Sequence, residues 1–135
     1  VNSFANAIRG GSGAVRIDYA TLAGWPVNYY YSWDGITVTN DQGASTSPMG
    51  DYVAPVRFYA NSTLTIEYTG MKTIKIYCNR DNDVQSLMDS IPSVEGVTVT
   101  SDGKVVTITF TDAVDSFVIE TLAKQIRVDK IEIYK

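Results

Sequence analysis

The sequence predicts an all-β fold, namely an antiparallel β-sandwich of jelly-roll type with one short helix. Three observations support this fold class. Thr, Val, Ile and Tyr are abundant, strong helix formers are few, and apolar and polar residues alternate with a period of two from Gly35 onward. Such alternation is typical of half-buried strands in antiparallel sheets.

The length and composition are those of one folded domain. A chain of 135 residues is long enough for a single hydrophobic core. Its contents of 44% hydrophobic and 19% charged residues are ordinary for a globular domain. The sequence has no linker, low-complexity segment or internal repeat. We therefore expect a single β-sandwich module that covers residues 1–135.

The elements follow from local patterns. One segment, DVQSLMDSI, has helical spacing, with Asp83 as its N-cap and Pro92 as its end. The apolar residues on one face of that helix are Val84, Leu87, Met88 and Ile91. Runs of alternating residues predict strands at 14–19, 29–33, 36–40, 53–59, 63–68, 73–79, 96–101, 104–111, 116–122 and 125–134.

Turn residues then suggest which strands pair. The Asp102-Gly103 dipeptide is a strong hairpin signal, and a two-residue turn there would set Val99 opposite Val106. Apolar residues would then meet apolar residues, as a stable register requires.

Two further features concern the second half of the chain. A three-residue loop at 69–71 would set Ile66 opposite Ile74 in a second hairpin. Along the last strand, the apolar residues Ile126 and Val128 occupy even positions, whereas Ile131 and Ile133 occupy odd positions. One extra residue near Asp129 and Lys130, that is a β-bulge, would keep all four on the buried face.

The aromatic run NYYYSWDGITVTN is expected to form a third hairpin. A two-residue turn at positions 34 and 35 pairs Trp33 with Ile36 and Tyr31 with Val38. Paired residues share a face of the sheet, so Tyr31 and Trp33 are expected in the core. Tyr30 is expected to point outward.

The remaining aromatic residues are candidates for ligand binding. Trp25, Asn28, Tyr29 and Tyr30 lie in or near the GWPVNYYY segment, and Tyr59 is a further candidate on an expected outward face. Tyr and Trp rings combine apolar area with a polar tip, while Asn supplies directional hydrogen bonds. This chemistry suits the C–H faces and hydroxyl rims of sugars. The alternative is that these rings are core or interface residues, since large rings are often buried.

Several functional classes are disfavoured by what the chain lacks. It has no histidine and a single cysteine, Cys78, which argues against His-dependent catalysis, an internal disulfide and cysteine-based metal sites. Its net charge of −4 and scattered basic residues argue against nucleic-acid binding. No apolar run is long enough for a membrane span. We expect no enzymatic activity and no cofactor.

One polar segment allows an alternative with a metal ion. In CNRDNDV the residues Asn79, Asp81 and Asp83 are spaced as at the beginning of a calcium loop. The glycine and the glutamate that complete such a loop are missing, so a polar turn that caps the helix is the preferred interpretation. A structural calcium ion is the alternative.

Beyond these patterns, the segments ITVTNDQG, VRFYANSTLTIEY, KTIKIYC and QIRVDKIEIYK resemble β-sandwich modules of large secreted or surface-attached proteins of gut bacteria. The resemblance covers residues 35–135. It implies a jelly-roll accessory module in a larger multi-modular protein, extracellular or at the cell surface, often beside glycan-degrading units. Some such modules bind polysaccharides such as starch. Related sandwiches serve as spacers or host-contact domains in phage particles and adhesins.

The sequence and the resemblance therefore favour two alternative functions. The first is non-catalytic binding of a polysaccharide or oligosaccharide by aromatic stacking, in an extracellular bacterial protein. The second is a structural or adhesive sandwich domain, on a bacterial surface or a phage, that mediates protein–protein contacts.

Overall fold

The computed structural model describes residues 4–9, 15–19, 28–33, 35–41 and 55–135. For the strands before residue 35 the description is of the backbone. Among all the residues that the structure describes, no helix is long and apolar enough to span a membrane.

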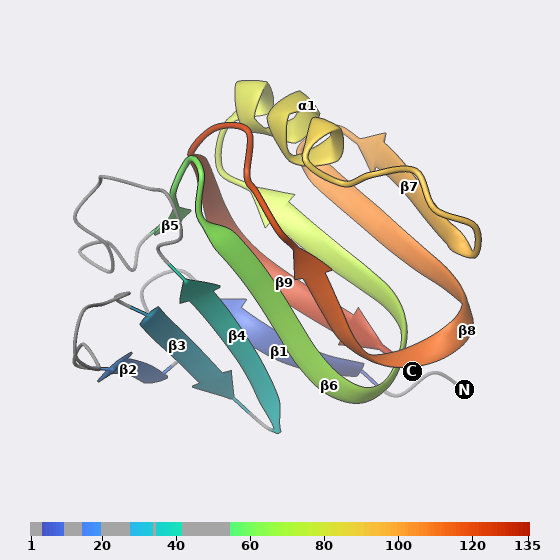
Figure 1. Cartoon of the computed structure of the whole chain (residues 1–135), viewed down its shortest axis with the longest axis horizontal. Coiled ribbons are helices and arrows are strands. Elements are labelled where there is room, and N and C mark those ends of the chain that lie inside the picture. Colours follow the sequence, from blue (N-terminus) through green and yellow to red (C-terminus); the bar gives the residue numbers. More distant parts are fainter. Residues whose placement is uncertain (1–3, 10–14, 20–27, 34, 42–54) are drawn as a thin grey trace.

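The described residues form nine strands and one helix, which confirms the expectation of an all-β fold with one short helix (Figure 1). The elements are β1 (Phe4–Arg9), β2 (Val15–Tyr19), β3 (Asn28–Trp33), β4 (Ile36–Asp41), β5 (Val56–Phe58), β6 (Thr63–Cys78), α1 (Asp81–Asp89), β7 (Val97–Asp102), β8 (Val105–Ile119) and β9 (Ile126–Tyr134).

All the described ladders are antiparallel and join in one sheet. Its main path is β1-β9-β6-β4-β3-β2, while β5 pairs with β9, β8 with β6, and β7 with β8. The long strand β6 is central. Its first part lies between β4 and the end of β8, and its second part lies between the start of β8 and β9.

The sheet curves back over itself. Among the described strands β1 pairs only with β9, yet its backbone also lies close to β3 and β4. In Figure 1, β1 accordingly runs behind the β3–β4 hairpin. The ladders belong to one continuous sheet, so the two-sheet sandwich of jelly-roll type stays a prediction.

Alternation along the strands places the core on one face of this curved sheet, and α1 packs against β6, β7, β8 and β9. The largest side chains with almost no exposure are Phe58, Ile36, Leu64, Ile66, Met71, Ile74, Ile76, Leu87, Ile108 and Ile119. Burial also raises the pKa of the Cys78 thiol to about 12, as expected for an unreactive cysteine in a core.

Two register predictions are confirmed. In the β3–β4 hairpin Trp33 is opposite Ile36 and Tyr31 is opposite Val38. In β9 the register against β6 shifts between Tyr77 and Cys78, which leaves one extra residue, Asp129, on the β9 side. The expected bulge is therefore present.

The predicted hairpin at residues 69–71 is wrong, because β6 continues through them as one strand. Gly70 has a φ of +77°, and the register shifts on both sides of Met71. A positive φ at a glycine can make a bulge as well as a turn. Here the chain bends and continues instead of reversing. The segments 104–111 and 116–122, expected as two strands, likewise belong largely to the single strand β8.

The β7–β8 hairpin forms with a different turn from the one predicted. Asp102 is opposite Val105, so Gly103 and Lys104 are the turn residues, and Val99 is opposite Ile108 instead of Val106. Gly103 has a φ of +58°, whereas Lys104 is not among the residues with positive φ. A glycine at the first central position is typical of a type II′ turn.

Helix α1 begins three residues earlier than predicted, because Arg80 and not Asp83 is its N-cap. Asp83 is therefore in the first turn and is not the cap. Its buried carboxylate accepts hydrogen bonds from Arg80 Nε at 2.9 Å, from Arg80 Nη2 at 2.7 Å and from the Arg127 backbone N–H at 2.9 Å. It joins the helix to β9.

Candidate functional site

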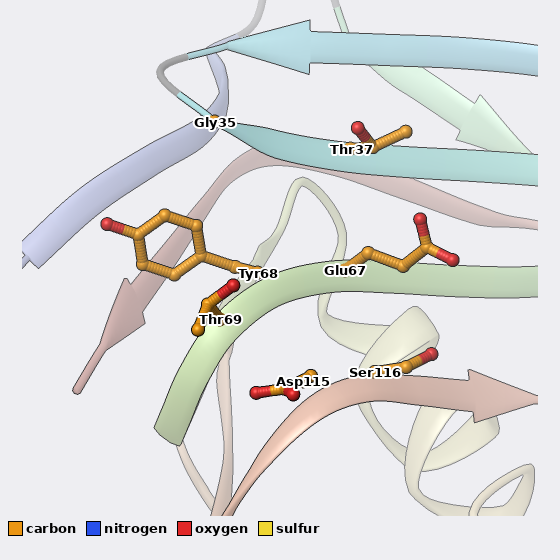
Figure 2. Close-up of a pocket in the computed structure, with 7 residues that line it drawn as sticks. All are labelled: Gly35, Thr37, Glu67, Tyr68, Thr69, Asp115 and Ser116. Carbon is orange, nitrogen blue, oxygen red and sulfur yellow. The ribbon is translucent and has the colours of Figure 1, made fainter.

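A polar depression of about 390 Å³ lies on the outer face of the sheet, where β4, β6 and β8 run side by side (Figure 2). Its lining residues are Gly35, Thr37, Glu67, Tyr68, Thr69, Asp115 and Ser116. Figure 2 shows that the lining contains hydroxyl groups, two carboxylates and one aromatic ring. Such a set of groups can accept and donate several hydrogen bonds to a polar ligand.

Strand register brings three of these residues into one row. Thr37 on β4 is opposite Glu67 on β6, and Glu67 is opposite Ser116 on β8. Their side chains share the face that is opposite the core, because Val38 and Ile66 beside them are fully buried. The row follows directly from the two ladders, so its geometry is set by rigid strands.

Tyr68 closes one end of the depression. Its ring is partly buried against the core, and a Cβ atom at Gly35 would lie 3.6 Å from its Cε1 atom. Gly35 therefore lies directly beside the ring. Lys135 Nζ lies 4.8 Å from the ring centroid. Lys135 is exposed, and such cation–π contacts contribute only about 0.5–1 kcal/mol.

Asp115 is fixed from the other side of the depression. Its Oδ1 atom accepts a hydrogen bond of 2.9 Å from the Gly70 backbone N–H. The bulge in β6 therefore orients this carboxylate. Glu67 and Asp115 together give the depression a negative charge, which favours uncharged ligands over anionic ones.

Two of the three sequence-predicted positions of β3 lie on this face, whereas the position of Tyr29 shares the core face with the buried Asn40. Asn28 is opposite Asp41, Tyr29 is opposite Asn40, and Tyr30 is opposite Thr39. The position of Tyr30 is therefore in the row next to the one that contains Thr37. Trp25 lies outside the described residues.

Tyr59 does not belong to the candidate site. Its side chain is only 6% exposed, whereas an outward orientation was predicted. The reason is that β5 ends at Phe58, so the alternation of the strand stops there. The chain then turns, with the Ser62 N–H donating to the Tyr59 carbonyl oxygen at 3.2 Å and Asn61 at a φ of +66°.

Sequence reasoning missed Glu67, Tyr68 and Asp115. The predicted hairpin at 69–71 ended the strand 63–68 at Tyr68 and paired it with the strand 73–79, so Glu67 and Tyr68 were not expected beside Asp115 on β8. The alternation of polar and apolar residues along this strand did indicate an outward position for Glu67. Glu67 is polar between two apolar positions, and this marks an outward position on a strand.

Two of the three residues considered for calcium, Asn79 and Asp83, are engaged elsewhere. Asp83 binds Arg80 and the Arg127 backbone, and Asn79 Nδ2 donates to Asp129 Oδ1 at 3.0 Å. Among the described residues no group of three or more metal-ligating side chains is present.

No family model matches the chain, and searches among curated proteins and solved structures found no significant match. A function for this chain is therefore inferred from its own residues.

Proposed function

We propose that this chain is a non-catalytic carbohydrate-binding domain, which holds a neutral polysaccharide or oligosaccharide on the outer face of β4, β6 and β8. The observation that carries the proposal is the depression that the Tyr68 ring closes at one end and that hydroxyl and carboxylate groups line. A sugar has an apolar C–H face and a rim of hydroxyl groups, and this lining complements both.

The site is open and shallow, so binding should be weak. One or two sugar units on such a surface correspond to a Kd of about 10 µM to 1 mM. The register of β3 extends the same face toward Tyr30, which gives a longer glycan room to continue along the sheet.

Binding without hydrolysis is proposed for a structural reason. In glycosidases the general acid is a carboxylic acid in apolar surroundings, paired with a second carboxylate. Glu67 and Asp115 are both exposed to solvent, and Asp115 is already hydrogen-bonded to the backbone. Neither has the surroundings of a general acid.

The biological setting is proposed from the resemblance of residues 35–135 to modules of gut-bacterial proteins. In that setting the domain is extracellular or at the cell surface and belongs to a larger protein. Starch is then the first glycan to test.

Affinity electrophoresis in gels that contain starch, xylan, β-glucan or mannan tests the proposal. Retarded migration is expected on at least one neutral glycan, and Tyr68→Ala should remove it. Tyr68→Phe should keep part of the retardation, because it retains the ring and loses only the hydroxyl group. Unretarded migration of the unchanged domain on all four glycans would refute the proposal.

A matched control is available on the other part of the sheet. Tyr134 is also half-buried, and Lys75 Nζ lies 5.5 Å from its ring centroid, but it is remote in register from Thr37 and Ser116. Tyr134→Ala should therefore leave the migration unchanged. Equal losses for Tyr68→Ala and Tyr134→Ala would indicate a general effect of destabilisation.

A further inference from the structure

Strand β7 has one free edge in the part of the chain that the structure describes, where β7 pairs with β8 alone. The Thr111 N–H donates to the Gly96 carbonyl oxygen at 2.9 Å. This bond determines which opposed residue pairs of the antiparallel ladder are hydrogen-bonded. Bonded pairs then recur at every second residue. Thr98 and Thr100 therefore bond to β8, while the backbone groups of Val99 and Ser101 point away from it.

This edge lacks the usual protection against strand addition. Natural edge strands are often interrupted by lysine, proline or a bulge. The β7 sequence VTVTSD contains no lysine or proline, and its register with β8 has no shift. It also consists mainly of Val and Thr, which favour the extended conformation.

A groove of about 260 Å³ runs between α1 and this strand. Figure 1 shows β7 at the margin of the sheet next to α1. The groove is lined by Gln85, Met88, Asp89, Ile91, Pro92, Ser93, Val97 and Val99. Val97, Val99 and Met88 are only partly buried, so their apolar surface is available to a partner.

The charge around the groove indicates the kind of partner. Asp89 on α1, Glu95 before β7 and Asp102 at its end are all exposed, with Lys104 in the turn as the basic residue nearby. The chain as a whole has a net charge of −4. A second copy of this chain would bring like charges together, whereas a basic segment would be attracted.

We propose that β7 and α1 form a docking groove for an extended, basic segment of a partner protein. The segment adds to the free edge of β7 as a further strand, and its backbone bonds to Val99 and Ser101. Side chains at alternate positions of the segment enter the groove over Met88. This is the general mode of peptide recognition by strand addition, in which the backbone supplies affinity and the pocket supplies selectivity.

Titration with a synthetic peptide tests the proposal. The probe is a peptide of nine residues in total, with two lysines at each end and alternating valine and threonine between them. Its control has glutamates in place of the lysines. Amide NMR spectra should show shifts concentrated in β7 and α1, and hydrogen exchange at Val99 and Ser101 should slow. Absence of binding at millimolar peptide, or equal binding of the control peptide, would overturn the proposal.

Two variants locate the binding. Ser101→Pro removes an N–H that β8 does not use, so the hairpin should persist while peptide affinity falls about tenfold or more. Thr100→Ala, which changes an exposed side chain on the opposite face, is the matched control and should bind normally. Glu95→Lys should weaken binding of the lysine peptide without any change in β7 itself. Unchanged affinity in both Ser101→Pro and Glu95→Lys, or peptide-independent dimerisation through β7, would contradict the assignment.

Discussion

At the residue scale, Asp83 shows how one side chain can join two elements. It is 2% exposed, and its carboxylate bonds both the Arg80 guanidinium and the backbone N–H of Arg127. The sequence predicted a polar role for Asp83 at the helix start, as a cap or, alternatively, as a calcium ligand. Its partner on β9 is distant in sequence, so no local pattern could reveal it.

Replacing Asp83 with alanine should lower the free energy of unfolding by about 2–4 kcal/mol. The variant leaves the Arg127 N–H without its acceptor and the partly buried Arg80 without its counter-ion. Urea unfolding followed by tryptophan fluorescence measures the loss. Asp81→Ala is the control, since Asp81 is exposed in the same helix turn, and it should cost less than about 1 kcal/mol. Equal losses in the two variants would contradict this role.

Tyr77 gives a prediction for pH. Its hydroxyl donates a hydrogen bond to Glu132 Oε1, and this bond, with burial and the negative charge of Glu132, raises the pKa of Tyr77 to about 12. The folded state thus favours the neutral phenol. Its stabilising effect is complete below the ordinary pKa of 10.0 and is lost as the pH rises toward 12.

The measurement compares the unchanged domain with Tyr77→Phe. The difference in unfolding free energy between them should be constant below about pH 10 and should shrink between about pH 10 and 12. A phenolate absorbance titration of the two proteins should assign the late-titrating group to Tyr77. A difference that stays constant up to pH 12 would show that the Tyr77–Glu132 bond does not contribute in this way.

At the element scale, β6 is the strand that organises the sheet. Gly70 at positive φ lets it bend and continue, so that its two parts pair with different neighbours. The sequence predicted an irregularity at this glycine but not whether the chain would reverse. Local residues could not decide this, because the outcome depends on β4, β8 and β9 lying alongside.

Gly70→Ala should destabilise the domain by about 1–2 kcal/mol, because an L-residue pays a steric cost at positive φ. Space is not the cause, since the nearest atom to an added Cβ is Lys135 Cδ at 4.0 Å. Gly70→Asn should cost less, since asparagine tolerates this conformation better. Thermal unfolding of the two variants measures the difference. Equal costs would point to a side-chain clash instead.

At the scale of the whole molecule, the sequence predicted the fold class better than the connections. Period-two alternation is a local property, and it correctly indicated a β-rich chain with one helix. Glycine positions correctly marked bends, as at Gly70 and Gly103, but the pairing around them depends on distant strands. The same limit applied to the site, because Thr37, Glu67 and Ser116 become neighbours only through the ladders β4–β6 and β6–β8.

The most direct test of the central proposal is an amide NMR titration of the domain with soluble neutral oligosaccharides. Shifts should concentrate at Thr37, Glu67, Tyr68 and Ser116, saturate in the micromolar to millimolar range expected for weak sugar binding, and disappear in Tyr68→Ala. If no neutral oligosaccharide shifts these amides at millimolar concentration, or if all shifts fall on other faces of the sheet, sugar binding at this depression is contradicted.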